Sequence, residues 1–273
     1  MVYRWNCNRC EFVVWAESGA ALRTGVQSHL LDHDRETLYK EGFKIGWNCP
    51  HCQASSLGHD VDEAVSQYER HLFEHVEDQI RSGVHVGNEI GGTGNVLVLS
   101  PPGTDGADDA RIHFTAPADV ALFVTTNVDD RLDTLATRLS EWPTRTIVLT
   151  TSERPLEGIE SDLSDVSLEI VKLDSGLGLA GLGETISRVI DEHNDPGYKL
   201  SVGFEIVSEI VAKFDLERVF RFLHLLTSRI ESADALGHYY WHPQQQTGPT
   251  LNLLGELFDL QLETTANRFV STG

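Results

Sequence analysis

The chain contains little lysine, a single methionine and no long hydrophobic run. Five of its 21 basic residues are lysine, and the others are arginine. No apolar stretch approaches the roughly 18 residues that a membrane-spanning helix needs. Residues 1–6 have neither the apolar core nor the cleavage signal of a secretory leader. We therefore expect a soluble, cytoplasmic protein with no membrane partner.

Positive charge is scarce throughout the chain. The net charge is −21, with 8 Lys and Arg against 13 Asp and Glu in residues 1–85 and 13 against 29 in the remainder. Neither part has the basic excess of a protein that neutralises phosphate groups. An acidic surface with few lysines suits a high-salt cytoplasm, because salt screens the repulsion between like charges. The composition predicts a halophilic source.

Cysteine is also rare, and all four cysteines belong to one repeated pattern. Each copy has two cysteines separated by two residues, followed by two histidines four positions apart. The copies are offset by 42 residues, and both begin with Trp-Asn-Cys. The repeated residues are Cys7, Cys10, His29 and His33 in the first copy and Cys49, Cys52, His71 and His75 in the second.

This pattern predicts metal ligands. The two cysteines of a copy share one turn, its histidines share one helix face, and two thiolates with two imidazoles suit tetrahedral Zn²⁺. Four protein ligands leave no open position, so each site is expected to be structural. A pair of disulfides would leave the histidine repeat unexplained. We predict two structural zinc ions per chain in a tandem zinc-finger module, residues 1–81, with units 3–40 and 43–81.

Each zinc unit is predicted to hold a hairpin and a helix. Ser18 can cap a helix that runs through His33, while Asp60 and Glu63 form a capping-box-like pair that opens a helix to about Arg81. Both helices carry an apolar stripe wider than one zinc unit needs. The two zinc units could pack on each other, on the following domain or on another chain, and we expect part of the stripe to contact a protein partner or a second copy. The stripe consists of Leu22, Val26 and Leu30, then Val65, Leu72, Phe73 and Val76.

Four further histidines are weaker candidates for metal ligands. His238 and His242 lie on one predicted strand without the companion ligands that zinc needs, so we expect them to pack in the core and at the strand end. His51 and His59 lie near the second cysteine turn, but neither has a counterpart in the first copy. We do not assign these four histidines to the zinc sites.

The pattern changes beyond a glycine-rich segment, residues 82–95, which we predict to be an interdomain linker. Apolar runs then alternate with helical segments of roughly ten to fifteen residues. This alternation predicts an α/β domain over 95–264, with a mostly parallel sheet covered by helices, and a polar, frayed tail over 265–273. The apolar runs are 96–99, 120–126, 146–151, 166–173, 200–204 and 236–241, and the main helical segments are 129–141, 183–193, 216–230 and 251–258.

The first strand of this domain leads into the sequence Ser-Pro-Pro-Gly-Thr-Asp-Gly-Ala-Asp-Asp, residues 100–109. A P-loop ATPase places glycines, a lysine and a hydroxyl here to hold phosphates. With Gly106 as the anchoring glycine, Ala107 takes the lysine position and Asp108 the hydroxyl position. Carboxylates would then face phosphates of like charge. The segment favours a surface turn, and we predict no catalytic and no cofactor-binding residue.

Three later segments carry a resemblance to a known family. They are Leu216–Leu226, Ala235–Pro243 and Leu257–Asp259, and they resemble a haloarchaeal family of RecA/KaiC-like domains of unassigned function. The resemblance covers about residues 95–264 and implies a RecA/KaiC-like fold. It also implies an acidic Walker B residue at the end of the strand near 202–204, where none is identified. Together with the altered P-loop, this predicts a degenerate, pseudo-ATPase domain.

These observations predict a zinc-binding, non-catalytic regulatory or interaction protein that binds a protein partner or forms a homo-oligomer. One alternative is a nucleic-acid-binding transcriptional regulator that acts through the fingers; another is an ATPase with an atypical nucleotide site. Charge disfavours the first alternative. Where DNA-reading fingers face base edges, the second helix holds Val-Asp-Glu-Ala at 61–64, and the first offers Arg23 and Gln27. The 18-residue spacer also exceeds the roughly 12 residues of the DNA-reading pattern.

Overall fold

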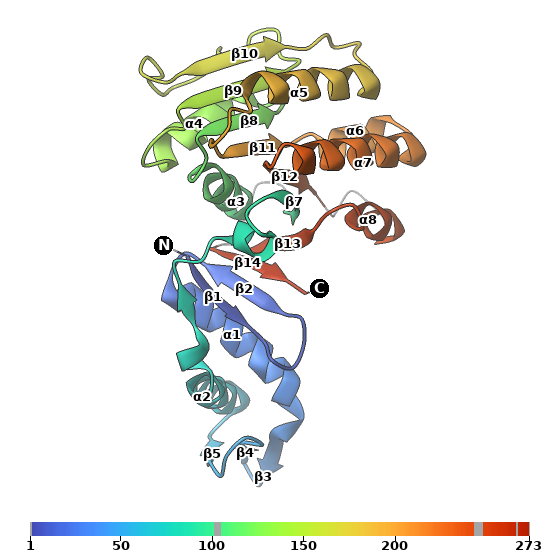
Figure 1. Cartoon of the computed structure of the whole chain (residues 1–273). Helices are drawn as coiled ribbons and strands as arrows, with labels where there is room; N and C mark the ends of the chain where they lie inside the picture. Colours follow the sequence, from blue (N-terminus) through green and yellow to red (C-terminus); the bar gives the residue numbers. More distant parts are fainter. Residues whose placement is uncertain (1, 101–104, 243–247, 266, 273) are drawn as a thin grey trace. The chain divides into compact units, whose positions relative to one another are not determined.

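The computed structural model describes residues 2–100, 105–242, 248–265 and 267–272 (Figure 1). Within these residues the chain divides into two compact units, Met1–Val84 and His85–Gly273. The boundary falls inside the segment 82–95 that was predicted to be a linker. Part of that segment is structured, because the 3-10 helix Val86–Ile90 belongs to the second unit and Val86 is buried. No helix among the described residues is long and apolar enough to cross a membrane.

The first half of unit one is a small antiparallel sheet with one helix. Strands β1 (Tyr3–Asn6) and β2 (Val13–Ala16) form a hairpin, and β6 (Arg81–Ser82) pairs with the other edge of β1. Helix α1 (Gly19–Asp34) begins at Ser18, whose side chain accepts a hydrogen bond from the Ala21 N–H, as the capping prediction required. A 3-10 turn, Arg35–Thr37, follows the helix.

The second half of unit one repeats this plan. Strands β3 (Leu38–Glu41), β4 (Lys44–Asn48) and β5 (Ser55–Gly58) form an antiparallel sheet in that order, followed by α2 (Val61–Glu74). The predicted capping-box-like pair is present: Asp60 accepts from the Glu63 N–H, and the Glu63 carboxylate accepts from the N–H of His59, the residue before the cap. The prediction that this helix reaches Arg81 is wrong. It ends at Glu74 because the chain turns through the 3-10 helix Glu77–Gln79 and then pairs with β1.

The apolar stripe of these two helices is largely used inside the unit. Helices α1 and α2 contact each other. Most stripe residues are buried, namely Leu22, Val26, Leu30, Leu72 and Phe73, whereas Val65 and Val76 are half-buried. Most of the stripe is therefore buried by packing within unit one, and little of it is left for a partner.

Unit two is built on a mostly parallel sheet, in agreement with the predicted α/β class. Its strands lie in the order β10-β9-β8-β11-β12-β7-β13-β14, all parallel except β14, which is antiparallel to β13. The strands are β7 (Gly94–Leu99), β8 (Val120–Val124), β9 (Arg145–Thr150), β10 (Leu168–Lys172), β11 (Leu200–Phe204), β12 (Leu236–Trp241), β13 (Leu260–Thr265) and β14 (Arg268–Ser271).

Helices cover both faces of this sheet (Figure 1). Alternate residues of β8 separate the two faces: Leu122 packs in the cluster with α5 and α7, whereas Phe123 packs with α4. Every residue of β7, β8, β11 and β12 is buried, as expected for parallel strands enclosed on two sides. The helices are α3 (Asp105–Thr115), α4 (Val128–Arg138), α5 (Leu179–His193), α6 (Val207–Lys213), α7 (Leu216–Ser232) and α8 (Gly248–Gly255).

Two predictions in this unit are corrected. The described part of the predicted tail, residues 265 and 267–272, is not frayed, because β14 pairs with β13 and Phe269 is buried. Asn267, with φ of 67°, lies in the connecting turn. Residues 105–109 are not a surface turn but the start of α3. The preceding residues 101–104, which belong to the segment compared above with a P-loop, lie outside the described residues.

Candidate metal centres

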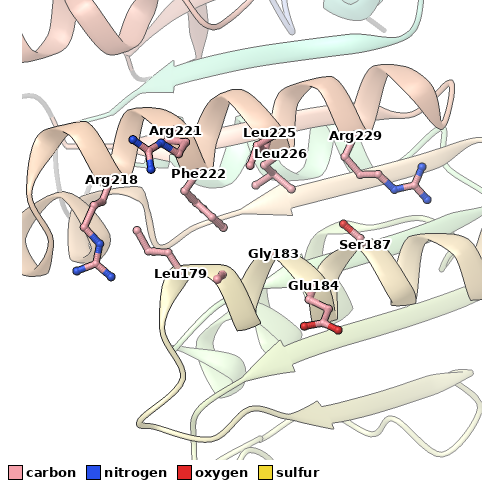
Figure 2. Close-up of a pocket in the computed structure, with 11 residues that line it drawn as sticks. Leu179, Gly183, Glu184, Ser187, Arg218, Arg221, Phe222, Leu225, Leu226 and Arg229 are labelled. Carbon is pink, nitrogen blue, oxygen red and sulfur yellow. The ribbon is translucent and has the colours of Figure 1, made fainter.

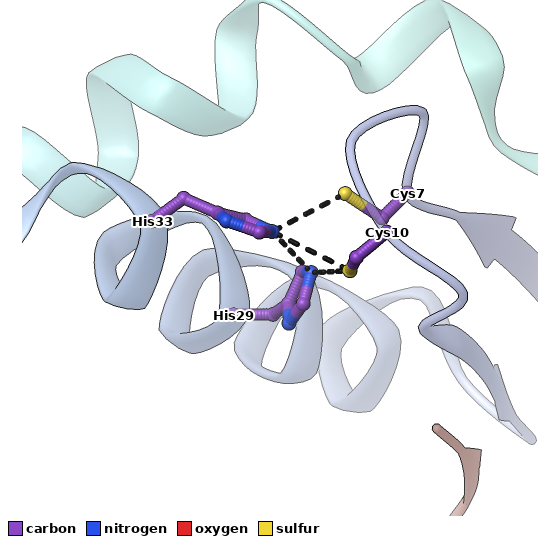
Figure 3. Close-up of side chains that lie close together, drawn as sticks. All are labelled: Cys7, Cys10, His29 and His33. Carbon is purple, nitrogen blue, oxygen red and sulfur yellow. Dashed lines mark hydrogen bonds between the residues drawn. The ribbon is translucent and has the colours of Figure 1, made fainter. Parts of the chain in front are cut away.

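The first cysteine–histidine set converges in space (Figure 3). Cys7 and Cys10 lie in the turn between β1 and β2, and His29 and His33 lie one turn apart on α1. The Cys10 Sγ lies 3.3 Å from the His29 Nε2 and 3.5 Å from the His33 Nε2, and the Cys7 Sγ lies 3.5 Å from the His33 Nε2. The two Nε2 atoms are 3.1 Å apart.

These separations fit one tetrahedral zinc ion. Zn–S bonds of about 2.3 Å and Zn–N bonds of about 2.0 Å place sulfur and nitrogen roughly 3.5 Å apart around a tetrahedron. The ligand atoms of each four-residue set all lie within 4.8 Å of one another. The donor types and their spacing therefore match a closed zinc site.

The second set repeats the first. The Cys49 Sγ lies 3.4 Å from the His75 Nε2, and the Cys52 Sγ lies 3.3 Å from the His71 Nε2. The two histidine Nε2 atoms are 3.2 Å apart. Both predicted four-residue sets are thus brought together, and among the described residues they are the groups able to hold a metal ion.

Local hydrogen bonds explain why both cysteine turns adopt this shape. The N–H of the first cysteine donates across each turn, from Cys7 to the Phe12 carbonyl and from Cys49 to the Ala54 carbonyl, both at 2.9 Å. Backbone N–H groups also point at the sulfurs: Arg9 donates to the Cys7 Sγ at 3.3 Å and His51 to the Cys49 Sγ at 3.4 Å. Such donors stabilise the thiolate form that binds a metal.

Aromatic rings hold the histidines in place. The His29 ring stacks on Phe12 with 3.8 Å between centroids, and the His71 ring stacks on Trp47 at 5.0 Å. Burial lowers the pKa of His29 and His75, and the neighbouring histidine lowers it further. Both effects favour the neutral imidazole, which is the form that binds zinc.

The thiols show why a cation suits these sites. Burial raises the pKa of Cys7 and Cys49, and the second cysteine of each pair adds to this effect. A bound dication reverses the balance and holds coordinating thiols deprotonated. All four cysteines are free of disulfides, so the disulfide alternative is not realised.

The other histidines have different contacts. His51 binds Asp34 rather than a metal set, with 3.1 Å between its Nε2 and the Asp34 Oδ2. His238 is fully buried between the Ser201 hydroxyl, at 3.0 Å, and the Tyr240 hydroxyl, at 2.8 Å, and burial lowers its pKa to about 3. The His242 Nδ1 lies 2.7 Å from the Ser100 carbonyl oxygen.

One charged site in unit two was missed by the sequence analysis. Glu205 follows the last residue of β11 directly, one position beyond the segment in which an acidic residue was sought. Its carboxylate is buried and accepts hydrogen bonds from the Nε atoms of Arg131, at 2.5 Å, and Arg111, at 3.0 Å. Asp108 accepts from the same two arginines, at 3.4 and 2.9 Å. The sequence did contain a signal for this site, because Glu205 is a single acidic residue directly after the apolar run 200–204.

The charge of Glu205 is retained despite its burial. Burial acts to raise its pKa, but the guanidinium groups of Arg131 and Arg111 outweigh it, and the pKa is lowered. Arg111 also lies over the Tyr240 ring, 4.4 Å from the centroid. The two carboxylates and two guanidinium groups thus form a closed network under the start of α3.

A groove lies between α5 and α7 on one face of unit two (Figure 2). Its volume is about 540 Å³. Small residues of α5, including Gly183 and Ser187, form one wall, and Phe222, Leu225 and Leu226 of α7 form the other.

The structure thus combines two Cys/His sets in unit one with an α/β domain that has a mostly parallel sheet. Residues 93–264 match the family of unknown function DUF7504, so the chain belongs to this family. The match nearly coincides with the residues 95–264 for which a family of unassigned function was expected. The relation to RecA/KaiC stays a prediction. No curated protein matches the chain.

The solved structures that match this chain include two from Pyrococcus horikoshii. An uncharacterized protein from Pyrococcus horikoshii, in complex with an unknown peptide, has a TM-score of 0.47 at 12% identity, covering 66% of this chain and 82% of that chain. A second protein, from Pyrococcus horikoshii OT3, has a TM-score of 0.43 at 12% identity, covering 63% and 82%.

Proposed function

We propose that this chain is a zinc-binding, non-catalytic interaction or regulatory protein, in which two structural zinc fingers accompany a pseudo-ATPase domain. The observation that carries the proposal is the duplicated set of two cysteines and two histidines at tetrahedral spacing. Each zinc ion would be held by four protein ligands, which leaves no coordination position for a substrate. The metal then supplies folding energy rather than chemistry.

The charged network of unit two supports a non-catalytic role. The position of Glu205 after β11 agrees with the acidic residue that the RecA/KaiC resemblance implies, and so supports that relation. Its carboxylate, however, is bound to Arg111 and Arg131, and Asp108 is bound to the same arginines. Neither acid is free to bind Mg²⁺, and Ala107 stands where a phosphate-binding lysine is required.

Several features favour a protein partner over nucleic acid. The start of α2 is acidic, and Asp60 and Glu63 are occupied in capping the helix. The start of α1 offers Gly19, Ala20 and Ala21, which have no side-chain hydrogen-bonding groups for base edges, and Arg23 further along pairs with Glu77 at 3.2 Å. In the molar salt expected for a halophile, electrostatic binding to phosphates is weakened, whereas apolar contacts are strengthened.

Two measurements on the full-length protein test this proposal. Metal analysis of protein purified without chelator should return two zinc ions per chain, and fewer than one would overturn the proposal. An affinity pull-down from native high-salt lysate should recover protein partners or further copies of the chain. Recovery of nucleic acid that survives molar KCl would favour a nucleic-acid-binding regulator instead.

A further inference from the structure

One buried carboxylate contacts both cysteine turns of unit one. Asp34 directly follows the ligand His33, and its side chain is 5% exposed. Its Oδ2 accepts a hydrogen bond from the Arg9 guanidinium at 2.7 Å and lies 3.1 Å from the His51 Nε2. Arg9 lies between the two cysteines of the first set, and His51 lies between those of the second.

The same two residues also hold the metal-binding sulfurs. The Arg9 N–H donates to the Cys7 Sγ at 3.3 Å, and the His51 N–H donates to the Cys49 Sγ at 3.4 Å. A continuous chain of contacts therefore runs from the first sulfur of one set, through Asp34, to the first sulfur of the other. The His51 ring also packs against the His75 ring, with 5.9 Å between centroids.

A second set of contacts follows the same direction. The Thr37 hydroxyl lies 2.7 Å from the Asp34 carbonyl oxygen and 2.9 Å from the Tyr68 hydroxyl on α2. Tyr68 is fully buried and stacks on Trp47, two residues before Cys49, at 5.0 Å. The end of α1 is thus connected to the second metal set through both its side chain and its backbone.

The repeat explains why this contact occurs once. Arg9 and His51 occupy equivalent positions, separated by the 42-residue offset of the repeat. The residue equivalent to Asp34 is Val76, which has no charge and cannot bridge two polar groups. Two equivalent turns therefore converge on one acidic residue, which belongs to the first copy alone.

We propose that Asp34 couples the two metal centres, so that the two zinc ions bind cooperatively. This rests on the zinc binding proposed above. A metal in either set orders its cysteine turn and so places Arg9 or His51 against Asp34, which preorganises the other turn through the shared carboxylate. Coupling of this kind is reciprocal, because each site must strengthen the other by the same factor. The two fingers then form one metal-dependent body rather than two independent units.

The test compares the affinity of the first set with the second set intact and disabled. The full-length protein is titrated with Zn²⁺ against a chromophoric chelator, as wild type and as the double variant Cys49→Ser/Cys52→Ser. The wild-type protein should hold zinc in the first set at least tenfold more tightly. In an Asp34→Asn background this ratio should fall to near one.

Matched variants separate coupling from a general loss of structure. Asp32→Asn changes an exposed carboxylate on the same helix that pairs with Arg35, and it should keep the full ratio. His51→Ala leaves the Asp34–Arg9 pair and the backbone N–H in place, so it should abolish the ratio while preserving the affinity that the first set has when the second set is disabled. Two zinc ions bound with independent affinities in the wild type, or an unchanged ratio in both Asp34→Asn and His51→Ala, would overturn the coupling but leave the zinc-binding function intact. Less than one zinc per chain would overturn both.

Discussion

The buried side chains of the two units are organised around different centres. In unit one the large buried rings of Trp47 and Tyr68 stack on each other, and Trp47 also stacks on His71 of the second cysteine–histidine set. In unit two the buried aliphatic and aromatic residues form continuous clusters on both faces of a parallel sheet. Each zinc unit, 3–40 or 43–81, is too short to bury enough apolar surface to be stable alone, whereas a domain the size of unit two does not need a metal.

This difference predicts opposite responses to loss of metal. Cys49→Ser should release the zinc of the second set and unfold residues 43–81. The α/β domain, unit two, should stay folded. Structural zinc supplies on the order of 10 kcal/mol, which exceeds the stability expected of such a small fold. Hydrogen exchange resolved by segment, together with metal analysis, measures both effects.

His59→Ala is the matched control for the cysteine variant. His59 lies near the same turn but outside the two ligand sets, so its replacement should leave the metal content and the exchange of α2 unchanged. Slow exchange retained throughout α2 after loss of the second zinc would show that the metal does not hold this unit together.

The largest effect in unit two should come from its charged network. Glu205→Gln removes the carboxylate that two buried guanidinium groups share, and breaking a buried ion pair in this way costs about 3–5 kcal/mol. Denaturant unfolding of unit two measures the loss, and the zinc content should not change. Glu157→Gln, in an exposed pair with Arg154, should cost less than about 1 kcal/mol. Equal effects of the two variants would contradict the assignment.

The same variant has a pH signature. The pKa of Glu205 is lowered in the folded state, so its stabilising contribution is complete above its unfolded pKa of about 4.3. The contribution is lost as the pH falls through the lower folded pKa. The difference in stability between wild type and Glu205→Gln should therefore be constant near neutral pH and shrink in acid.

The apolar core of unit two should respond to truncation without any change in metal binding. Leu122 lies on β8 and is 1% exposed, so Leu122→Ala leaves a cavity and should cost about 2–5 kcal/mol. Leu156, which is 53% exposed, provides the control: Leu156→Ala should leave unfolding unchanged. Release of zinc from unit one in Leu122→Ala would indicate that the two units do not unfold separately.

The sequence predicted the parts of the molecule that local spacing determines. The four-residue metal sets follow from a turn and a helix face, and the caps at Ser18 and Asp60 follow from contacts within four residues. The apolar runs alternate with helical segments, and a strand that helices cover on both faces is apolar along its whole length. This alternation therefore predicted the parallel sheet. These features can be predicted without knowing which distant segments of the chain contact each other.

The features that were missed depend on such distant contacts. The end of α2 is set by the pairing of β6 with β1, some 77 residues away along the chain (Arg81 with Arg4). The Glu205 network joins residues from α3, α4 and the end of β11. Asp34 connects the two cysteine turns because it contacts His51, which lies 17 residues further along the chain. No spacing rule connects these positions, because the tertiary fold brings them together.

Helix caps offer the finest comparison between the units. Asp60 accepts from the Glu63 N–H at 2.8 Å in unit one, and Asp215 accepts from the Arg218 N–H at 3.0 Å in unit two. Replacing either by alanine should cost about 1 kcal/mol. For Asp215→Ala we expect a Tm of unit two lower by roughly 2–4 °C. For Asp60→Ala we expect about fivefold weaker zinc binding at the second set, because folding and metal binding are linked there. Serine at either position keeps the cap and should restore both values, whereas a Tm shift of unit two caused by Asp60→Ala would contradict the separation of the two units.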